Sequence, residues 1–203
     1  MSSEPDAIPS AGFETQVFWE QHKSKIVLYG ALLIAAVLIF AVYQITVERR
    51  TTASSALLAQ AVKPEDYKAV IEKYPRTVAA GNAHLLLAKA LRDEKKYDDA
   101  AATLQVFTQN FPEHPLASTG WLSLAETLDA AGKSDEAASA YQQVVAKFPD
   151  SYAAPLAGLE QANLLRARGK DNEAKRVYEN VFTQYPDSAF AQQAMREMRL
   201  LPK

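Results

Sequence analysis

Two patterns of hydrophobic and polar residues divide the chain, and the first is an unbroken apolar run near the N-terminus. Residues 26–47 include no charged side chain over 22 positions. A helix that rises about 1.5 Å per residue would extend roughly 33 Å over this run, which is enough to cross a hydrocarbon core of about 30 Å. Charged residues flank the run, with Lys23 and Lys25 before it and Arg49 and Arg50 after it. The pattern predicts one transmembrane helix over residues 26–47.

A buried core helix and a cleaved signal peptide are the two alternatives for this run. A core helix seldom stays apolar on every side for six turns, and a signal peptide has a shorter apolar stretch behind a short basic leader. Here 25 residues precede the run, and four of them are acidic. These features favour an uncleaved membrane anchor that follows an N-terminal tail of residues 1–25. Within the tail, residues 13–21 read equally well as a short helix or as an extension of the anchor helix.

The second pattern is a repeat of 37 residues in the rest of the chain. Four prolines have this spacing, and each follows an aromatic residue: Tyr74-Pro75, Phe111-Pro112, Phe148-Pro149 and Tyr185-Pro186. Other residues recur in the same register, among them Ala88, Ala125 and Ala162, and Leu91, Leu128 and Leu165. Small residues let two helices approach closely, and apolar residues three or four positions apart form a buried stripe. A fixed period of this length predicts a solenoid of helix pairs.

The turn inside each helix pair has its own signal. Gly132 and Gly169 fall between two helical stretches, where a residue with a positive φ angle ends the first helix. Lys95 holds the same register in the first repeat, so that turn must be made without glycine. Acidic residues such as Asp98 and Asp99 open the second helices, where they complement the helix dipole, and we interpret them as structural. The proline after each aromatic residue then stops the second helix.

The middle repeat is similar to the tetratricopeptide (TPR) pattern, which runs Trp-x2-Leu-Gly-x2-Tyr, then Ala-x3-Phe, then Pro. Its matching residues are Trp121, Leu124, Ala125, Leu128, Ala137, Tyr141 and Pro149. The first repeat has His84 at the tryptophan position. The third repeat has Gly158 there and Gln161 at the leucine position, which weakens the expected packing. We therefore expect an all-α fold, a TPR helical solenoid with an N-terminal transmembrane helix.

The expected domain organisation has three parts, which are the tail (1–25), the transmembrane helix (26–47) and a TPR domain (48–203). The domain is expected to hold repeats at about 79–115, 116–152 and 153–187 and a C-terminal capping helix at 189–200. A partial unit precedes the first repeat. Its residues Tyr67, Val70 and Tyr74 are in phase with a second helix, whereas residues 49–62 do not match the pattern of a first helix.

This layout resembles that of the YfgM-like family. The shared features are a short tail with Phe18-Trp19-Glu20 before Lys23, one anchor, a Thr/Ala-rich helix, and long-period repeats that end in Tyr-Pro-Asp-Ser. The resemblance implies a single-pass protein of the bacterial inner membrane whose C-terminal domain is periplasmic. It also implies an ancillary role at the Sec translocon. The linker motif is similar to that of TPR proteins of outer-membrane assembly and cell-envelope coordination as well, so the layout alone favours the translocon.

In a TPR stack the first helix of each pair lines the concave face, so residues on it that avoid the buried stripe are expected to face a protein-binding groove. These residues are Asn82, Leu86, Lys89, Arg92, Thr119, Ser123, Glu126, Asp129, Leu159, Glu160, Asn163 and Arg166. The set mixes both charges with some leucine, and it differs from the Lys/Asn clamp that TPR domains use on C-terminal carboxylates. Such a groove suits helices or mixed segments of a partner protein. For each residue taken singly, an ordinary solvated surface is the alternative.

Composition argues against several classes of function. The chain has 203 residues, and 48% of them are hydrophobic, which is enough for a core. It has no cysteine, so disulfides, thiolate metal sites and Cys nucleophiles are excluded. Residues 48–203 hold 20 basic and 20 acidic residues, which argues against a nucleic-acid partner. His22, His84 and His114 are not spaced to share a metal, and no Gly-rich phosphate loop is present. We expect no catalytic, metal or cofactor site, and hence no enzyme.

Three functional hypotheses remain. The first is a membrane-anchored adaptor whose partners are translocon subunits, periplasmic chaperones and translocated proteins. The alternative is a structural TPR scaffold for cell-envelope or outer-membrane assembly machinery. A third, a membrane-tethered cytoplasmic adaptor, requires the opposite topology, and the flanking charges leave the orientation nearly even. The identity of the partner and self-association of the chain stay open.

Overall fold

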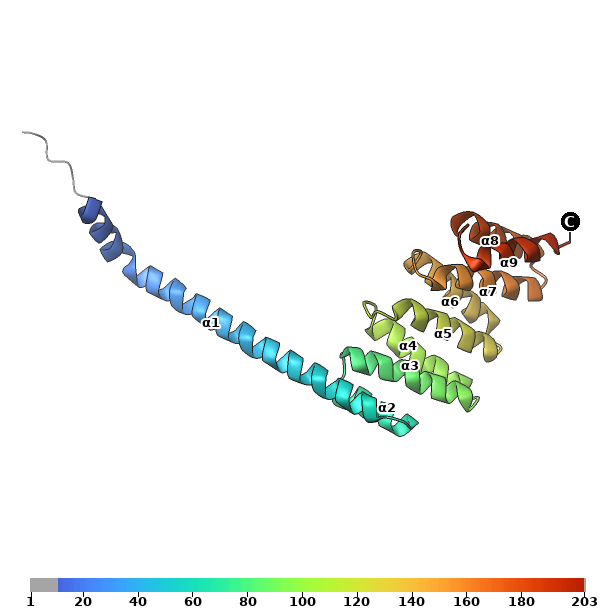
Figure 1. Cartoon of the computed structure of the whole chain (residues 1–203), viewed down its shortest axis with the longest axis horizontal. Coiled ribbons are helices and arrows are strands. Elements are labelled where there is room, and N and C mark those ends of the chain that lie inside the picture. Colours follow the sequence, from blue (N-terminus) through green and yellow to red (C-terminus); the bar gives the residue numbers. More distant parts are fainter. Residues whose placement is uncertain (1–10, 203) are drawn as a thin grey trace, which may run out of the picture. The chain divides into compact units, whose positions relative to one another are not determined.

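In the computed structural model the chain is built from helices. The structure describes residues 11–202, apart from the side chains of residues 11–18, 21 and 26. This part of the chain contains no strand, which confirms the predicted all-α class. In chain order its helices are α1 (Ala11–Gln60), α2 (Pro64–Lys73), α3 (Val78–Asp93), α4 (Tyr97–Asn110), α5 (Ala117–Ala130), α6 (Ser134–Lys147), α7 (Ala153–Ala167), α8 (Asp171–Gln184) and α9 (Ala189–Arg199) (Figure 1).

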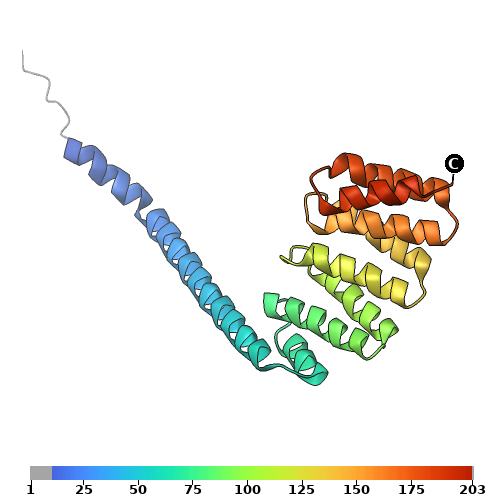
Figure 2. The same ribbon diagram turned by 45° about the vertical axis from the view of Figure 1, so that its right-hand side comes forward.

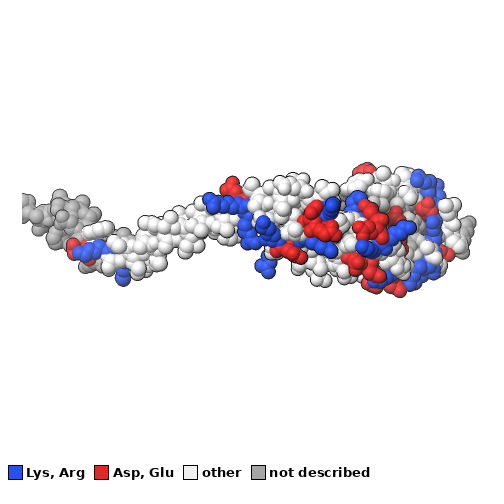
Figure 3. Space-filling model, turned by 90° about the horizontal axis from the view of Figure 1, so that it is seen from below, with Lys and Arg blue, Asp and Glu red and all other residues white. Residues whose placement is uncertain are grey.

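Helix α1 contains the whole apolar run. Its apolar side chains are exposed, with 71% of the Ile39 surface accessible, and Figure 3 shows them as a white stretch between charged groups. By length and composition, the part from His22 to Gln60 is apolar enough to cross a membrane. The helix begins at Ala11, so residues 11–25 of the expected tail are helical and continuous with the apolar run. No proline interrupts the sequence from Ala11 to Gln60, so nothing breaks the helix there.

The last turns of α1 pair with α2 in the compact unit of residues 50–203. Leu57 and Leu58 pack against a buried cluster formed by Val70 of α2 with Ala79 and Ala83 of α3. Ser54 is fully buried, and its hydroxyl donates to the carbonyl oxygen of Thr51 (2.9 Å). The sequence pattern did not identify this stretch as a first helix, because it carries a small polar residue where the other repeats carry TPR-like residues.

Three helix pairs follow, α3–α4, α5–α6 and α7–α8, and each packs against the next. They stack in chain order, and α9 covers the last pair (Figure 2). Ala88, Ala125 and Ala162 are buried, as the close approach of two helices requires. One hydrophobic cluster extends from α3 to α7 and a second joins α7, α8 and α9, so the core continues along the stack.

Side-chain size is matched where each second helix meets the next first helix. Three of these contacts place a valine and an alanine in the same cluster: Val70 with Ala83, Val144 with Ala157, and Val181 with Ala194. The fourth has the larger Phe107 and the smaller Gly120. A Cβ atom on Gly120 would lie 2.1 Å from Phe107 Cε1, so only glycine fits beside this ring. The total volume is therefore kept nearly constant at each contact.

The turns agree with their sequence signals. Gly132 and Gly169 have φ angles of 76° and 72°, and Lys95 adopts 62° at the equivalent position without glycine. A lysine in this left-handed region is strained relative to glycine. The second helices end at the aromatic residues Tyr74, Phe111, Phe148 and Tyr185, as the following prolines predicted.

Candidate functional site

The surface formed by α3, α5 and α7, here called the first-helix face, carries most of the residues predicted to face a groove. A cleft of about 430 Å³ lies between α3 and α5. Five of the predicted residues line it, namely Leu86, Lys89, Arg92, Thr119 and Ser123. Cleft residues up to 37 positions apart in the sequence, such as Leu86 and Ser123, meet in space because successive first helices lie next to each other.

The cleft has an apolar wall and a charged rim. Leu86 and Leu116 are 40% and 42% exposed, which is high for leucine in a folded domain, and both line the cleft. At the rim the Lys89 ammonium donates to the Asp93 carboxylate (2.7 Å). Apolar anchors beside charged groups are the composition of a protein-binding surface.

Charged pairs link neighbouring first helices along this face. The Arg92 guanidinium of α3 donates to the Glu126 carboxylate of α5 over 3.3 Å. Farther along, Arg166 of α7 pairs with Glu197 of α9. All four side chains are partly exposed, so these pairs add little stability and are open to exchange for a partner's charges.

Two buried tyrosines place their hydroxyl groups beneath the same face. Burial, followed by the nearby carboxylates of Glu126, Glu160 and Asp129, raises the pKa of the Tyr141 phenol above its usual range. The phenol therefore stays protonated, and it has no hydrogen-bond partner in the described part of the chain. One repeat later, the Tyr178 hydroxyl donates to Asn163 Oδ1 (2.6 Å).

Asn163 of α7 extends the polar region around the Tyr141 and Tyr178 hydroxyl groups into the third repeat. Its amide nitrogen donates to Glu160 Oε2 (3.2 Å), while its amide oxygen accepts from Tyr178. Together with the carboxylates near Tyr141, these contacts make the middle of the first-helix face acidic and polar. The Lys89 and Arg92 side chains lie at its α3 end, and Arg166 lies at its α7–α9 end.

Leu159 is a correction to the predicted site. Only 1% of its surface is accessible, and it lies in the hydrophobic cluster of α7, α8 and α9. The third repeat lacks the aromatic and leucine residues of the TPR pattern at Gly158 and Gln161, and these two residues line a separate cavity of about 290 Å³ between α6 and α8. Of the remaining predictions, Asn82 is half-buried near the start of α3 and Asp129 is exposed at the end of α5, and neither lines the cleft.

Five residues that line the cleft were not among the predicted site residues: Ala88 and Leu104, which the repeat pattern assigned to the core, and Leu85, Asp93 and Leu116. Leu116 precedes α5, and so it fell outside the helices that were considered. Leu85 and Asp93 lie one residue from predicted members of the site. Counting helix positions from the start of α3 at Val78 would have included Leu85 and Asp93 in the predicted site. Nothing in the repeat pattern indicates Leu116.

His84 and His114 act in packing. His114 is buried, its Nδ1 accepts from the Leu116 backbone N–H (3.0 Å), and its Nε2 lies 3.2 Å from the Val78 carbonyl oxygen. The ring thus ties the start of α3 to the start of α5. His84 is 8% exposed and packs on the Phe111 ring, with centroids 5.7 Å apart. Within the described residues, no group of three or more His, Asp or Glu side chains could hold a metal ion.

Comparisons with known proteins agree with this architecture. Residues 16–200 match the family described as the tetratricopeptide repeat-like domain. A search of curated proteins found no match to this chain. Among solved structures, BtubC (BKLC) from P. vanneervenii superposes with a TM-score of 0.53 at 17% identity over 75% of this chain, which spans 64% of BtubC.

Repeats of a putative kinesin light chain from Podospora anserina are also similar in structure. Two crystal structures, one of them of a point variant, give TM-scores of 0.54 and 0.55 at 18% and 17% identity, over 75% of this chain and 83% of theirs. At such identities the likeness shows the fold alone. The TPR fold is typically a non-enzymatic scaffold that binds other proteins, and TPR repeats form the predicted solenoid here. The chain therefore belongs to the tetratricopeptide repeat-like domain family.

Proposed function

We propose that this protein is a membrane-anchored adaptor of the bacterial inner membrane that binds proteins at the Sec translocon. In this proposal α1 crosses the membrane through residues 26–47, and the TPR domain lies in the periplasm. The first-helix face binds translocon subunits, periplasmic chaperones or proteins that have just been translocated. The placement follows from the resemblance of the chain's layout to the YfgM-like family.

The cleft between α3 and α5 is the observation that carries the binding role. Its two exposed leucines, Leu86 and Leu116, offer an apolar anchor point, and the Arg92–Glu126 pair beside them offers both charges. A partner helix with apolar residues on one face and mixed charges at its flanks is complementary to this surface. A surface that accepts helices of this general kind suits a protein that binds several different partner proteins.

The length of the apolar stretch supports anchoring in a membrane. Its side chains find no cover within the described chain, and exposing so many of them to water would be unfavourable. Lipid satisfies them, while the backbone groups are paired inside the helix.

Site-specific photo-crosslinking tests the partner. A photoreactive residue at Ser123, inside the cleft, is compared in living cells with one at Lys175, an exposed position on α8. We expect adducts with translocon subunits, periplasmic chaperones or secreted proteins from position 123 and not from position 175. Adducts with cell-wall enzymes or outer-membrane assembly factors would instead favour the scaffold function. Equal adducts from both positions would rule out the cleft as the binding site.

Cysteine labelling tests the topology, and the chain has no native cysteine to interfere. Ser139→Cys on α6 is exposed and is expected to react with a membrane-impermeant maleimide in intact spheroplasts. Ser3→Cys, on the other side of the apolar run, is expected to react only after lysis. The reverse result would place the TPR domain in the cytoplasm and would reject the periplasmic part of the proposal.

A further inference from the structure

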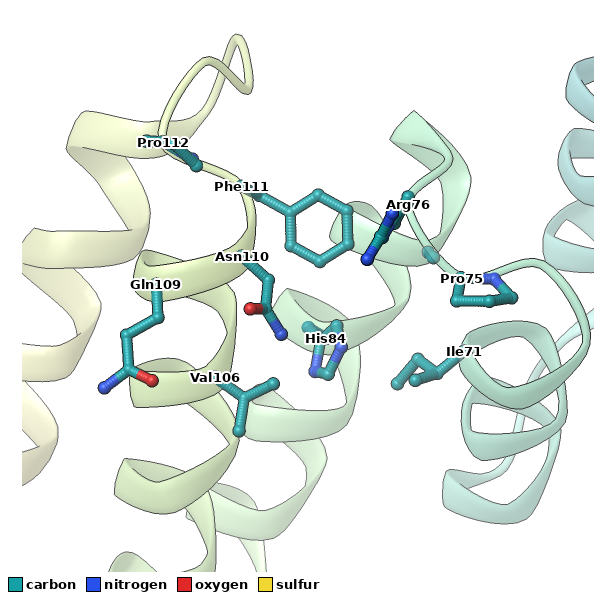
Figure 4. Close-up of a pocket in the computed structure, with 10 residues that line it drawn as sticks. Ile71, Pro75, Arg76, His84, Val106, Gln109, Asn110, Phe111 and Pro112 are labelled. Carbon is teal, nitrogen blue, oxygen red and sulfur yellow. The ribbon is translucent and has the colours of Figure 1, made fainter. Parts of the chain in front are cut away.

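The second helices and the first helices of the stack differ in how their surfaces repeat. Where successive second helices adjoin, cavities of about 620, 680 and 290 Å³ lie between α2 and α4, α4 and α6, and α6 and α8, and Figure 4 shows the first of them. A cavity that recurs from repeat to repeat belongs to the packing of the solenoid. On the first-helix face, by contrast, one position changes the sign of its charge in the middle repeat.

That position is Asp129, which interrupts a series of arginines. Arg92 lies 37 residues before it and Arg166 lies 37 residues after it, so the three side chains hold one position in successive repeats. Arg166 forms an ion pair with Glu197 of α9, and the residue equivalent to Glu197 one repeat earlier is Glu160 of α7. The junction between α5 and α7 therefore has two carboxylates where the next junction has an arginine and a carboxylate.

Neither carboxylate of this junction has a cationic partner within the described residues. Asp129 and Glu160 form no ion pair there, and Glu160 accepts a hydrogen bond from the neutral Asn163 amide (3.2 Å). The Arg92 guanidinium is already engaged with the Glu126 carboxylate (3.3 Å). Carboxylates that share a site repel each other, and a cation between them would turn that repulsion into attraction.

A buried tyrosine hydroxyl points to the same place. Tyr141 is 3% exposed, and in the part of the chain that the structure describes its hydroxyl has no hydrogen-bond partner. One repeat later, the Tyr178 hydroxyl donates to Asn163, which lies 37 residues after Glu126. The Tyr141 hydroxyl is therefore directed toward the Glu126 carboxylate, which pairs with Arg92 instead. Buried polar groups are normally paired, so this hydroxyl is a group that a ligand can satisfy.

An arginine side chain matches this arrangement. The Tyr141 oxygen keeps access to the surface, unlike the enclosed Nδ1 atom of His84, and a phenol oxygen accepts hydrogen bonds from N–H groups. A guanidinium carries its N–H donors in a planar fork, which suits two carboxylates and a phenol better than a compact ammonium does. The third repeat supplies such a group from within the chain, through Arg166.

The junction between α5 and α7 is one helix away from the cleft between α3 and α5. Neighbouring helices pack about 8–10 Å apart, a distance that a partner helix covers in about six or seven residues. A single segment can therefore place apolar side chains against Leu86 and Leu116 and a basic side chain between α5 and α7.

We propose that the middle of the first-helix face, formed by Asp129, Glu160 and the Tyr141 hydroxyl, binds an arginine side chain of the partner segment whose apolar residues occupy the cleft between α3 and α5. This inference rests on the proposed function, because it assigns a recognition residue to the partner of that same face. A defined peptide and purified protein test it, so its outcome is separate from that of crosslinking at position 123 in cells.

Calorimetry with the full chain in detergent measures binding of the peptide N-acetyl-Leu-Ala-Ala-Leu-Ala-Gln-Ala-Arg-Ala-Ala-Gln-amide. Its leucines and its arginine share one face of a helix, and a matched peptide has uncharged citrulline in place of the arginine. Asp129→Arg restores the arginine of the neighbouring repeats, and Glu179→Arg makes the same change of charge at an exposed position on α8. Tyr141→Phe removes the unpaired hydroxyl, and Tyr178→Phe removes the paired one.

We expect the arginine peptide to bind the wild-type chain about tenfold or more tightly than the citrulline peptide, because one charge-assisted contact is worth at least that factor. Asp129→Arg should abolish this preference, since the chain then supplies its own arginine. Tyr141→Phe should reduce the preference about fivefold, the value of one hydrogen bond. Glu179→Arg and Tyr178→Phe should keep it.

Absence of binding to the wild type, equal binding of the two peptides, or a preference that survives in Asp129→Arg would overturn the inference. So would an equal loss in Glu179→Arg, which would show a general effect of net charge. Far-UV circular dichroism checks the fold of each variant, and if Asp129→Arg does not fold, the contrast between Tyr141→Phe and Tyr178→Phe decides alone. Translocon or chaperone adducts from position 123, combined with any of these contrary results, would leave the adaptor function standing and reject only the arginine site.

Discussion

The first and middle repeats have the same packing residues but differ where a side chain reaches a surface or the next repeat. Ala88 and Ala125 are buried at the same place in both. At the position of the TPR tryptophan, both residues line a cavity between successive second helices, but His84 packs on the Phe111 ring, whereas Trp121 lies under Lys147 of its own repeat. The period therefore specifies how helices stack, and departures from the period specify what each repeat can do. Four measurements test this comparison.

The largest loss of stability is expected for a substitution in the third repeat. Leu85, Leu122 and Leu159 are in phase, but only Leu159 is fully buried. Leu159→Ala should lower the free energy of unfolding by about 3 kcal/mol, because it leaves a cavity among α7, α8 and α9. Leu85→Ala, the matched change, should cost about 1 kcal/mol because part of that side chain remains in water. Urea denaturation in detergent, followed by circular dichroism, measures both, and equal losses would mean that Leu159 is not a core residue.

Gly120→Ala should disrupt the packing of Phe107 in the first repeat against residue 120 in the middle repeat. Its new Cβ atom would overlap the enclosed Phe107 ring, and the net loss of stability should be about 2 kcal/mol after the better helix propensity of alanine is counted. Phe107→Val in the same chain should restore much of this loss, since it recreates the valine–alanine contact of the other repeats. A double-mutant cycle measures the coupling. Additive effects of the two changes would show that the two residues do not compete for the same space.

The pH dependence of stability should differ between the two repeats. Burial lowers the pKa of the His84 imidazole below its ordinary value. The unfolded chain therefore takes up a proton at a higher pH than the folded chain does, and stability falls as the pH drops from about 7 through the ordinary histidine value near 6.5. His84→Phe should remove this part of the decline. Thermal unfolding of both chains at several pH values tests it, and parallel curves would contradict it.

Lys95→Gly should give the smallest effect, and one of opposite sign. Lys95 has a positive φ angle where the later repeats have Gly132 and Gly169. Glycine should relieve the strain and raise stability by up to about 1 kcal/mol. Glu94→Gly, one residue earlier with φ of −81°, should instead lower stability. A decrease for both variants would mean that the turn is not strained at Lys95.

The solenoid was predictable because its signals recur. Four aromatic-proline pairs fix the ends of the second helices, and two glycines fix the turns. The turn at Lys95 was also predictable, since its register was known. The first-helix face was predicted in large part, because positions on a helix that avoid the buried stripe must lie on another side of it.

The remaining features depend on contacts between distant residues. Leu159 is buried because it lies in one cluster with residues of α8 and α9, and its own position in the repeat does not reveal these contacts. His114 was assigned to a loop, yet its ring bridges two helices through backbone groups that no sequence pattern reveals. The end of α1 packs against α2 and α3 through Leu57 and Leu58, while Ser54 holds the register of Leu91 with a small polar side chain. In each case the contacts of the residue depend on which distant residues lie next to it, rather than on the residue type itself.

The match between Phe107 and Gly120 limits how such a gene can gain or lose repeats. Excision of residues 84–120 removes both residues together, and the flanking contacts of Val70 with Ala83 and Val144 with Ala157 are kept. Excision of residues 108–144 has the same length, but it would place the Phe107 ring against Ala157. Unequal recombination in this gene should therefore be tolerated at some crossover points and selected against at others, although every product keeps the 37-residue register.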